Sequence, residues 1–354
     1  MSKSVMLAMS GGTDSSVCAM LLQEQGYVVK GVTFRMFDTS DACPVFVQDA
    51  KDLAARLNME HYVVDIRDHF RDDIIDTFMT QYQEGITPNP CVLCNNTIKW
   101  PYLVDAADKY GCDYIATGHY TRVEKFEDRH YIVEGEDVEK EQSFFLWGLP
   151  QEILSRTIFP LGGFTKDKIR QLAADRGFEK VATKKDSMGV CFLQGEDYRN
   201  FLHERYQTKD IQIPKGHFVD EDGTVLGEHQ GIPFYTLGQR RGLGINLNRA
   251  LYVVDMDVPN NKIVLGGKDR LSIQRMVLEN CHVTAPDIMD FRELEVRIRY
   301  RKQFVLGRVL KIENDLMEIE LHSPEILESP GQTAALYHQG RVVAGGWIKS
   351  NHPV

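Results

Sequence analysis

The chain has 354 residues, which at roughly 150 residues per domain corresponds to two or three domains. Hydrophobic residues make up 43% and charged residues 26% of the chain, which is ordinary for a globular protein and excludes disordered, collagen-like and coiled-coil classes. The formal net charge of -10 argues against a protein that coats nucleic acid, since such proteins are basic as a whole, but it is compatible with a local basic face.

No apolar run reaches the ~18–20 residues that are needed to span a bilayer, so no membrane partner is expected. The N-terminus enters a strand-like segment directly and lacks the pattern of a signal peptide, which predicts a cytoplasmic protein. Seven cysteines are an odd number in a chain of this kind. The count favours reduced thiols with individual roles over a disulfide framework.

The first half of the chain alternates strand-like and helix-like segments. Strands are expected over 5–9, 27–34, 60–66 and 113–117, and helices over 17–25, 45–57, 69–84 and 98–110. Such alternation predicts a doubly wound parallel sheet, in which ligands bind beyond the carboxyl ends of the strands. Both Ser10–Ser15 and the pair Gly118-His119 fall at such ends.

The second half follows a different pattern. A charged hairpin is expected over 120–135, and helices over 165–177 and 197–206. Short strands separated by turn residues are expected after about residue 208, over 250–255, 262–266, 294–300, 305–312, 316–321 and 341–348. This pattern predicts small β-barrels. We therefore expect an α/β domain with a doubly wound parallel sheet over 1–205, a small central linking domain over 206–270 and a C-terminal β-barrel over 271–354.

The string Ser10-Gly11-Gly12-Thr13-Asp14-Ser15 stands between the first strand and the first helix. Two glycines let the backbone approach an anion closely, and the start of a helix offers N–H groups and a favourable dipole for phosphate. Asp14 suits such a site when Mg²⁺ accompanies the phosphates. The alternative is an ordinary turn in which Asp14 or Ser15 caps the helix. The complete string at the end of the first strand favours a phosphate loop.

This string lacks the Gly-Lys-Ser/Thr ending of a P-loop and the spaced glycines of the dinucleotide fingerprint. It resembles the PP-loop of the ATP pyrophosphatase superfamily. The resemblance implies that the loop grips the β,γ-pyrophosphate of ATP while the α-phosphate is attacked, which gives an adenylated substrate. It does not identify that substrate.

Three cysteines lie in segments that favour chemistry. Cys91 and Cys94 have a Cys-x-x-Cys spacing in the Pro-bracketed segment 87–95, which is expected to be a rigid loop, and Cys191 follows a polar stretch far downstream. Three interpretations remain open. The thiols hold Zn²⁺ or an Fe–S cluster, or Cys191 carries a persulfide with Cys94 as its partner, or the thiols are buried and inert.

Lysines near these cysteines in the sequence would lower the thiol pKa values wherever the groups meet in space. They are Lys99, Lys184 and Lys185. The remaining cysteines have no such neighbourhood and are interpreted as inert; they are Cys18, Cys43, Cys112 and Cys281.

A basic segment, 292–311, interrupts the acidic chain. Arg297, Arg299 and Arg301 alternate in it, so a strand would place them on one face, which suits contact with phosphates. Gln239-Arg240-Arg241 is a second candidate for such contact, and Tyr300 and Phe234 are candidates for stacking on unpaired bases. The alternative for an isolated basic strand is a solvated face. Solvated positions are also expected for Lys166, Lys168 and Arg170 and for the acidic stretch 134–141.

Taken together, these strings resemble the bacterial tRNA-specific 2-thiouridylase family over nearly the whole chain. The matching strings occur in the expected order: Ser10–Ser15, Thr87–Asn95, Ala116–Tyr120, Glu141–Leu146, Lys185–Phe192, Gly227–Gly244 and Arg299–Arg301. The family transfers sulfur to C2 of the wobble uridine of certain tRNAs. Its fold is a PP-loop domain, a small central domain and a C-terminal β-barrel, which agrees with the division expected here.

The resemblance also implies roles for individual residues. Cys191 would carry the persulfide and Cys94 would be the catalytic partner thiol. ATP, with Mg²⁺, would be bound by Ala8, Met9, Ser10, Gly11, Gly12, Thr13, Asp14, Ser15, Met36 and Gly118. The target base would touch Asn89, Pro90 and Cys91. The tRNA would touch His119, Lys140, Glu141, Gln142, Arg299, Tyr300, Arg301 and Gln332. An upstream sulfur donor or relay protein is a further expected partner.

The expected chemistry is coherent. Adenylation turns the C2 oxygen of uracil into a leaving group, a persulfide supplies the sulfur, and a second thiol releases it and leaves a transient Cys94–Cys191 disulfide. Many family members carry Asp at the position of Cys91, where it is a candidate general acid or base, and that carboxylate is missing here. An alternative hypothesis is therefore a [4Fe–4S] cluster held by Cys91, Cys94 and Cys191, with one iron open to sulfide.

Two other classes of function are weighed against thiolation. A PP-loop ligase or amidating synthetase would transfer nitrogen and would not need the three cysteines. A non-catalytic RNA-binding protein with a structural metal would turn over no ATP.

Overall fold

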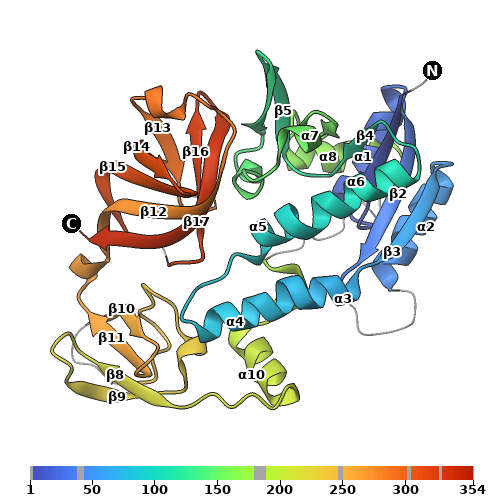
Figure 1. Ribbon diagram of the computed structural model, residues 1–354. Helices are drawn as coiled ribbons and strands as arrows, with labels where there is room; N and C mark the ends of the chain where they lie inside the picture. The colour runs from blue at the N-terminus through green and yellow to red at the C-terminus, as the bar shows by residue number, and fades with distance from the viewer. Residues whose placement is uncertain are drawn as a thin grey trace. The chain divides into compact units, whose positions relative to one another are not determined.

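A computed structural model describes residues 3–37, 44–178, 189–245, 250–300, 304–326 and 329–353 (Figure 1). The chain forms two compact units. The first contains Met1–Ile74, Cys91–Ser187 and Tyr337–Val343, and the second contains Ile75–Pro90, Met188–Leu336 and Ala344–Val354. No helix in the described ranges is both long enough and apolar enough to cross a membrane.

The described strands of the first unit form a parallel sheet with the order β3-β2-β1-β4-β7. They are β1 (Ser4–Ala8), β2 (Val28–Arg35), β3 (Glu60–Asp65), β4 (Tyr114–Ala116) and β7 (Thr157–Ile158). Val5 of β1 pairs with Val29 on one side and with Tyr114 on the other. The strand order therefore reverses beside β1, and this reversal is where open parallel sheets bind their ligands.

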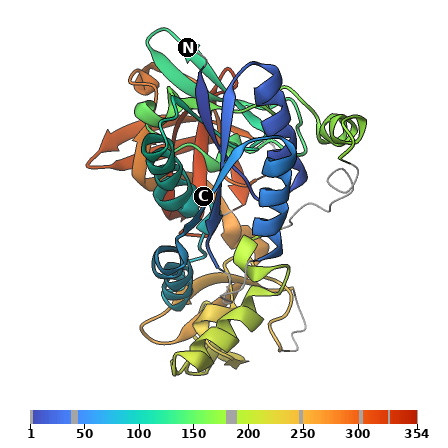
Figure 2. The same ribbon diagram turned by 90° about the vertical axis from the view of Figure 1, so that its right-hand side faces the viewer.

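Helices cover both faces of this sheet, which confirms the doubly wound arrangement. Figure 2 shows α1 (Thr13–Glu24) and α2 (Val45–Arg56) on one face and α6 (Trp100–Lys109) on the other. Side chains of β1 and α1 are fully buried in a common core with residues of α8 (Lys166–Asp175). Its members include Val5, Leu7, Val17, Leu22, Ile169 and Ala173.

The segment after β4 adds a hairpin of β5 (Thr121–Phe126) and β6 (Arg129–Glu134), as expected from its charged, alternating sequence. Two short helices, η3 (Ser143–Phe145) and α7 (Gln151–Leu154), follow it. Residues 337–343, the tip of a hairpin from the C-terminal part of the chain, also belong to the first unit. There Arg341 pairs with Val133 of β6.

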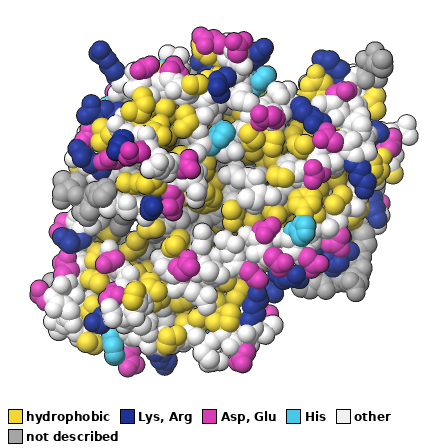
Figure 3. All heavy atoms as spheres, in the orientation of Figure 1, with side chains coloured by type: hydrophobic (Ala, Val, Ile, Leu, Met, Phe, Trp, Pro, Cys, Tyr) yellow, Lys and Arg dark blue, Asp and Glu magenta, His cyan; other side chains and the backbone are white. Residues whose placement is uncertain are grey.

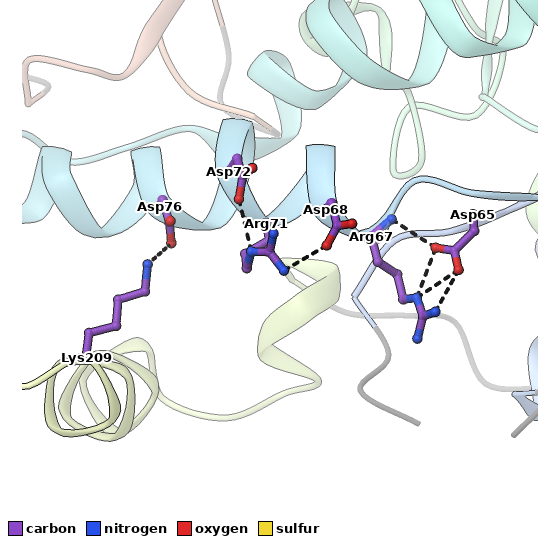
Figure 4. A network of polar contacts seen from close by, with 7 residues as sticks. All are labelled: Asp65, Arg67, Asp68, Arg71, Asp72, Asp76 and Lys209. Atoms are coloured by element: carbon purple, nitrogen blue, oxygen red, sulfur yellow. Dashed lines mark hydrogen bonds and ion pairs between the residues drawn. The ribbon is translucent and has the colours of Figure 1, made fainter. Parts of the chain in front are cut away.

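A long helical stretch follows β3 as α3 (Arg67–Phe70), the π-helical η1 (Arg71–Asp76) and α4 (Thr77–Gln83). Its charged side chains pair on the surface (Figure 4). In the first unit Arg67 bonds Asp65 at 2.7 Å, and in the second Lys209 bonds Asp76 at 2.6 Å. These groups are solvent-exposed, so the pairs orient side chains and add little to stability.

The segment expected to be a rigid loop over 87–95 is helical from Pro90 onward. It forms α5 (Pro90–Cys94), which runs directly into the π-helical η2 (Asn95–Lys99) and then α6. The expectation failed because proline favours the first turn of a helix, where its missing N–H is not needed. π-helical turns are rare in proteins, and those that occur often lie at functional sites.

The second unit opens with α4, joined by η4 (Cys191–Leu193) and α10 (Tyr198–Thr208). Its small central sheet has the order β10-β11-β8-β9, from β8 (Gly216–Val219), β9 (Val225–His229), β10 (Tyr252–Asp257) and β11 (Lys262–Gly266). The short helix η5 (Ile232–Phe234) lies between β9 and β10, η6 (Lys268–Leu271) follows β11, and η7 (Ile288–Asp290) lies further along the chain, between the first two strands of the barrel.

The C-terminal strands form a closed barrel, as expected. Its described strands are β12 (Ser272–Val283), β13 (Leu294–Arg297), β14 (Val305–Glu313), β15 (Leu316–Ile326), β16 (Thr333–His338) and β17 (Arg341–Pro353). The order β12-β15-β14-β13-β16-β17 closes because β12 also pairs with β17, which leaves no free edge. The strand expected over 294–300 ends at Arg297.

Candidate active site

The string 10–15 connects β1 to α1 at the reversal of the strand order. Gly11 has a φ of +64°, and a Cβ there would lie 2.6 Å from the backbone oxygen of Phe46 at the start of α2. Only glycine fits, because both the backbone conformation and the approach of α2 exclude a side chain. Gly11, which was expected to let the backbone approach an anion, therefore also allows the start of α2 to pack closely against the loop.

The helix α1 begins at Thr13, four residues earlier than expected. Gly12 is its N-cap and makes no side-chain capping bond. The expected alternative, a cap by Asp14 or Ser15, is wrong, because both lie inside the first turn. Ser15 accepts a bond from the Ser10 amide at 3.3 Å and fixes the loop instead. A helix start without a side-chain cap suits an anion.

Asp14 is held by two residues from distant elements. Lys166 donates to both of its carboxylate oxygens, at 2.8 and 2.9 Å, and the hydroxyl of Tyr120 donates to one of them at 2.6 Å. The Lys166 side chain is only 7% exposed. The expectation that Lys166, Lys168 and Arg170 form a solvated helix face is therefore wrong for Lys166, although Lys168 is exposed.

Helical spacing explains this placement. Lys166 shares one face of α8 with Ile169 and Ala173, and these three are the buried residues of that helix. A period of 3.6 residues puts positions i, i+3 and i+7 together, so the sequence carried the signal that Lys166 faces inward.

The segment after β4 lies against the loop 10–15, as expected. A Cβ at Gly118 would lie 3.1 Å from Cβ of Asp14 and 3.3 Å from the amide of Ser15. The loop residues Ala8 and Met9 lie at the end of β1, and Met36 follows β2 with its side chain partly exposed. All ten residues that were expected to bind ATP therefore belong to the first unit.

Cys91 and Cys94 lie one turn apart on α5, where Cys94 is buried. Burial raises the pKa of both thiols, and the nearby Lys99 ammonium opposes that rise only in part. The expected lowering by Lys99 therefore exists but is outweighed by desolvation.

His119 lies between α6 and the loop 10–15. Its ring stacks on Trp100, at 6.2 Å between centroids, and its Nδ1 bonds Thr117 Oγ1 at 2.7 Å. Burial, and then the Lys99 charge, hold the pKa of His119 well below its usual range, so the ring is neutral at pH 7. Gly118 next to it faces Asp14. Residues 118–119 thus lie between the loop 10–15 and Trp100, the first residue of α6, which continues the helical stretch that begins with α5.

Cys191 lies on the short helix η4 of the second unit, and it is exposed. The neighbouring Phe192 is buried and packs edge-on against Phe78, at 5.2 Å between ring centroids, and also against Phe201. The aromatic anchor fixes the turn while leaving the thiol accessible. Lys184 and Lys185 lie outside the described residues.

The metal interpretation gains no support from the described ranges, which contain no group of three or more His, Cys, Asp and Glu side chains suited to a metal ion. Cys91 and Cys94 belong to the first unit and Cys191 to the second. The cluster hypothesis therefore stays a prediction. Cys18 is buried and its thiol donates to the Thr117 carbonyl, as suits an inert residue.

The segment expected to touch the target base is fixed by the barrel within the second unit. Gln332 donates to the carbonyls of Thr87 and Pro88, at 3.0 Å each, and the Thr87 amide donates to Pro330. Asn89 and Pro90 directly follow Thr87 and Pro88, the two residues that these bonds hold. Sequence reasoning assigned Gln332 to tRNA and missed that its amide group holds the loop.

The expected RNA string Lys140-Glu141-Gln142 lies in the first unit, in the segment between β6 and η3. The acidic stretch 134–141 was expected to be a solvated loop, but Asp137 and Glu141 are buried, at 9% and 7% exposure. The expectation is wrong for these two residues, because their carboxylates accept backbone N–H groups, whereas Glu136 and Glu139 are exposed as expected. Acidic side chains bonded in this way do not need water.

In the barrel, the expected alternation of the basic strand holds through Arg299. Leu294, Val296 and Ile298 are buried, and Arg297 and Arg299 are half-buried on the other face. Tyr300 follows in a turn, and Arg301 lies outside the described residues. Burial lowers the pKa of Arg299, and the carboxylate of Glu325 opposes this. Acidic and basic side chains are interspersed on the surface seen in Figure 3.

Comparison with known proteins agrees with this architecture. Three family models match in succession: a tRNA methyl transferase HUP domain over residues 3–195, a tRNA methyl transferase PRC-barrel domain over 199–267, and an aminomethyltransferase beta-barrel domain over 273–348. The first of them covers more than half of the chain.

Curated relatives match over nearly the full length. The chain is 46% identical to tRNA-specific 2-thiouridylase MnmA 2 of Phocaeicola vulgatus, over 97% of each chain. It is also 46% identical to tRNA-specific 2-thiouridylase MnmA 1 of Bacteroides fragilis, over 98% of this chain and 97% of that one. The enzyme of the same name from Amoebophilus asiaticus is 41% identical, over 98% and 95%.

Proposed function

The chain belongs to the family of tRNA-specific 2-thiouridylases, and from this premise we propose that it thiolates C2 of the wobble uridine of tRNA in an ATP-dependent reaction. One observation carries the proposal. Residues 118–119 approach Asp14 of the loop 10–15 on one side and Trp100 on the other, and Trp100 opens α6, which continues the helical stretch that begins with the thiol-bearing α5. Activation by ATP and attack by sulfur have to take place near one another, and this connection supports the proposal.

In the proposed first step, the C2 oxygen of the uridine attacks the α-phosphorus of ATP. The new O–P bond forms as the bond to the β-phosphate breaks, and pyrophosphate leaves with the electron pair. The nucleotide would be held by Ala8, Met9, Ser10, Gly11, Gly12, Thr13, Asp14, Ser15, Met36 and Gly118. Mg²⁺, when bound with ATP, would neutralise phosphate charge beside Asp14.

In the second step, the terminal sulfur of a Cys191 persulfide attacks C2, and AMP leaves. The Cys94 thiolate then attacks the Cys191 sulfur, the S–S bond breaks, and its electron pair forms the thiocarbonyl of the product. A Cys94–Cys191 disulfide remains, which an external thiol reduces. The exposure of Cys191 supports this assignment, because an upstream sulfur donor or relay protein has to reach it.

RNA would be bound by residues of both units. Asn89, Pro90 and Cys91 are proposed at the target base. The proposed tRNA contacts are His119, Lys140, Glu141, Gln142, Arg299, Tyr300, Arg301 and Gln332. We keep the domain boundaries expected from the sequence, 1–205, 206–270 and 271–354, and a cytoplasmic location, where tRNA is modified.

Because Cys91 stands where many family members carry a carboxylate, we also consider a second route for sulfur transfer. Cys91, Cys94 and Cys191 would be the ligands of a [4Fe–4S] cluster, which would supply an open iron for sulfide. The described residues of the first unit bring two of these thiols onto one helix. Iron and acid-labile sulfide in anaerobically purified protein decide between the routes, since an iron-free and fully active enzyme excludes the cluster.

The test of the proposal is incubation with tRNA, ATP and a sulfide source, followed by mass analysis of the nucleosides. We expect 2-thiouridine, AMP and pyrophosphate from the native chain, adenylation without thiolation from Cys191→Ser, and no adenylation from Asp14→Ala. Normal 2-thiouridine from Cys191→Ser removes the role of that thiol. Full activity of a variant lacking all three cysteines indicates a nitrogen-transferring ligase, and absence of AMP and pyrophosphate indicates a non-catalytic RNA-binding protein.

A further inference from the structure

Asp137 is a buried carboxylate that joins two segments of the first unit. Its Oδ1 accepts the amides of Glu139 and Lys140, at 3.0 and 3.1 Å, and its Oδ2 accepts the amide of Lys166 at 2.6 Å. The first two bonds shape the segment 137–142, which we call the coupling loop. The third bond fixes the first residue of α8. A buried carboxylate that accepts three N–H groups is costly to displace.

The bond from Lys166 leads to the nucleotide site. Lys166 is the first residue of α8, and its side chain donates to both oxygens of Asp14. The Asp137 carboxylate therefore fixes the backbone position from which the Lys166 side chain reaches Asp14. Since that ammonium is next to the Asp14 carboxylate, a displacement of the coupling loop changes the charge balance where Mg²⁺ and ATP phosphates are proposed to bind.

The other end of the coupling loop reaches the same carboxylate through Tyr120. Gln142 forms two hydrogen bonds with the Tyr120 backbone, each at 3.0 Å. The backbone N–H of Gln142 donates to the Tyr120 carbonyl, and the backbone N–H of Tyr120 donates to the side-chain Oε1 of Gln142. The Tyr120 hydroxyl donates to Asp14 at 2.6 Å. Gly135 packs closely on the Tyr120 backbone, since a Cβ there would lie 2.7 Å from the Tyr120 oxygen. Both ends of one short loop thus converge on Asp14.

We propose that Asp137 is a positioning residue that couples RNA binding at the coupling loop to nucleotide binding at Asp14. The inference rests on the proposed function, because the RNA contacts of Lys140, Glu141 and Gln142 are part of it. RNA that orders the loop also orders Lys166 and Tyr120, so a nucleotide that binds afterwards has less ordering to impose. Coupling of this kind is reciprocal, so each ligand strengthens the binding of the other.

The experiment measures the Kd of a non-hydrolysable ATP analogue with Mg²⁺, with and without a saturating anticodon stem-loop RNA. In the native chain we expect the RNA to tighten analogue binding about tenfold. Asp137→Asn keeps one oxygen for the turn amides but presents an NH₂ group to the Lys166 amide, which cannot bond to it. We expect its coupling factor to fall below about twofold. The matched control Asp128→Asn, at the exposed tip of the β5–β6 hairpin, keeps the native factor.

A native coupling factor in Asp137→Asn, or no coupling in the native chain, overturns the inference. The coupling factor is a ratio within one protein, so a general loss of stability does not mimic its disappearance. If Asp137→Asn does not fold, Gln142→Met tests the second path to Asp14 by the same ratio. Product analysis keeps the two proposals apart. A native chain that forms AMP and pyrophosphate with tRNA but shows no coupling contradicts only this inference, whereas absence of these products contradicts the proposed function.

Discussion

Gln332 donates its side-chain amide to two successive backbone carbonyls, those of Thr87 and Pro88, at 3.0 Å each. Gly331 beside it has a φ of +85°, and a Cβ there would lie 2.9 Å from the Thr87 oxygen. The two segments are therefore in close backbone contact within the second unit. Pro88 and Pro90 bracket Asn89 and lack N–H groups, so the carbonyls of Thr87 and Pro88 hold this segment together with the Thr87 amide, which donates to Pro330.

We predict that Gln332→Met lowers kcat/KM for tRNA about tenfold and leaves ATP binding unchanged. Methionine has a similar size but donates no hydrogen bond, and two neutral bonds contribute about 1–3 kcal/mol together. Steady-state thiolation at varied tRNA concentration measures the effect. Gln212→Met, at an exposed position of the same unit, is the control. An unchanged kcat/KM in Gln332→Met contradicts the holding role.

The Asp14–Lys166 pair gives a second prediction. Lys166→Met leaves the Asp14 carboxylate without its ammonium partner, so we expect the free energy of unfolding to fall by about 1–3 kcal/mol. Loss of the positive charge beside the ATP phosphates should slow adenylation at least about 100-fold. Release of pyrophosphate in a single turnover and chemical denaturation measure the two effects.

Lys168→Met is the matched control for that variant, because Lys168 lies on the same helix but is exposed. It should keep both stability and adenylation within about twofold. If both variants adenylate at the native rate, Lys166 has only a structural role at Asp14.

The limits of sequence reasoning are clear at these residues. The strand–helix alternation, the position of the loop 10–15 at the end of β1 and the barrel were predictable because each follows from local spacing. The partnership of Lys166 with Asp14 was not, because the two residues are 152 positions apart and neither local pattern refers to the other. For Asp137 and Glu141, the acidic composition suggested that the side chains are exposed to solvent. The backbone N–H groups that donate to the buried carboxylates cannot be recognised in a sequence.

The thiols show a different limit. Sequence reasoning expected lysines to lower their pKa values, and Lys99 does act in that direction. Burial raises both pKa values and outweighs the lysine, and it depends on packing around α5, which could not be judged from Cys-x-x-Cys spacing. The helical start at Pro90, in contrast, was open to prediction, since proline is frequent in the first turn.

The raised pKa of Cys94 predicts a pH dependence for sulfur transfer. The thiolate is the reactive form, and a pKa above the ordinary value keeps it scarce at neutral pH. The rate of thiolation should therefore rise as pH increases from neutral toward that pKa. Lys99→Met removes the charge that favours the thiolate, so the pKa rises further and the whole increase moves to higher pH.

Single-turnover thiolation of pre-adenylated tRNA across a pH series measures this shift. Adenylation, followed by pyrophosphate release in the same samples, should show no shift, since it does not use the thiol. Lys109→Met, an exposed lysine at the end of α6, should reproduce the native profile. Superimposable profiles for Lys99→Met and the native chain would contradict a reactive Cys94 thiolate.

Gly11 and Gly26 allow the cost of backbone conformation to be separated from the cost of contact. Both have positive φ, at +64° and +85°, but a Cβ at Gly11 would lie 2.6 Å from the Phe46 oxygen and 2.8 Å from Cβ of Asp49, whereas Gly26 has nothing within 4 Å. Gly26→Ala should therefore lower the free energy of unfolding by about 1 kcal/mol and leave ATP binding intact.

Gly11→Ala should show the same conformational strain and, in addition, weaken ATP binding about tenfold or more, because the loop or the first turn of α2 has to move to admit the methyl group. The Kd of an ATP analogue and the midpoint of thermal unfolding are compared for the two variants. Equal effects of both substitutions on the Kd would mean that α2 does not constrain the nucleotide loop. A loss confined to Gly11→Ala would show that the glycine is required by its close approach to α2 as well as by its backbone conformation.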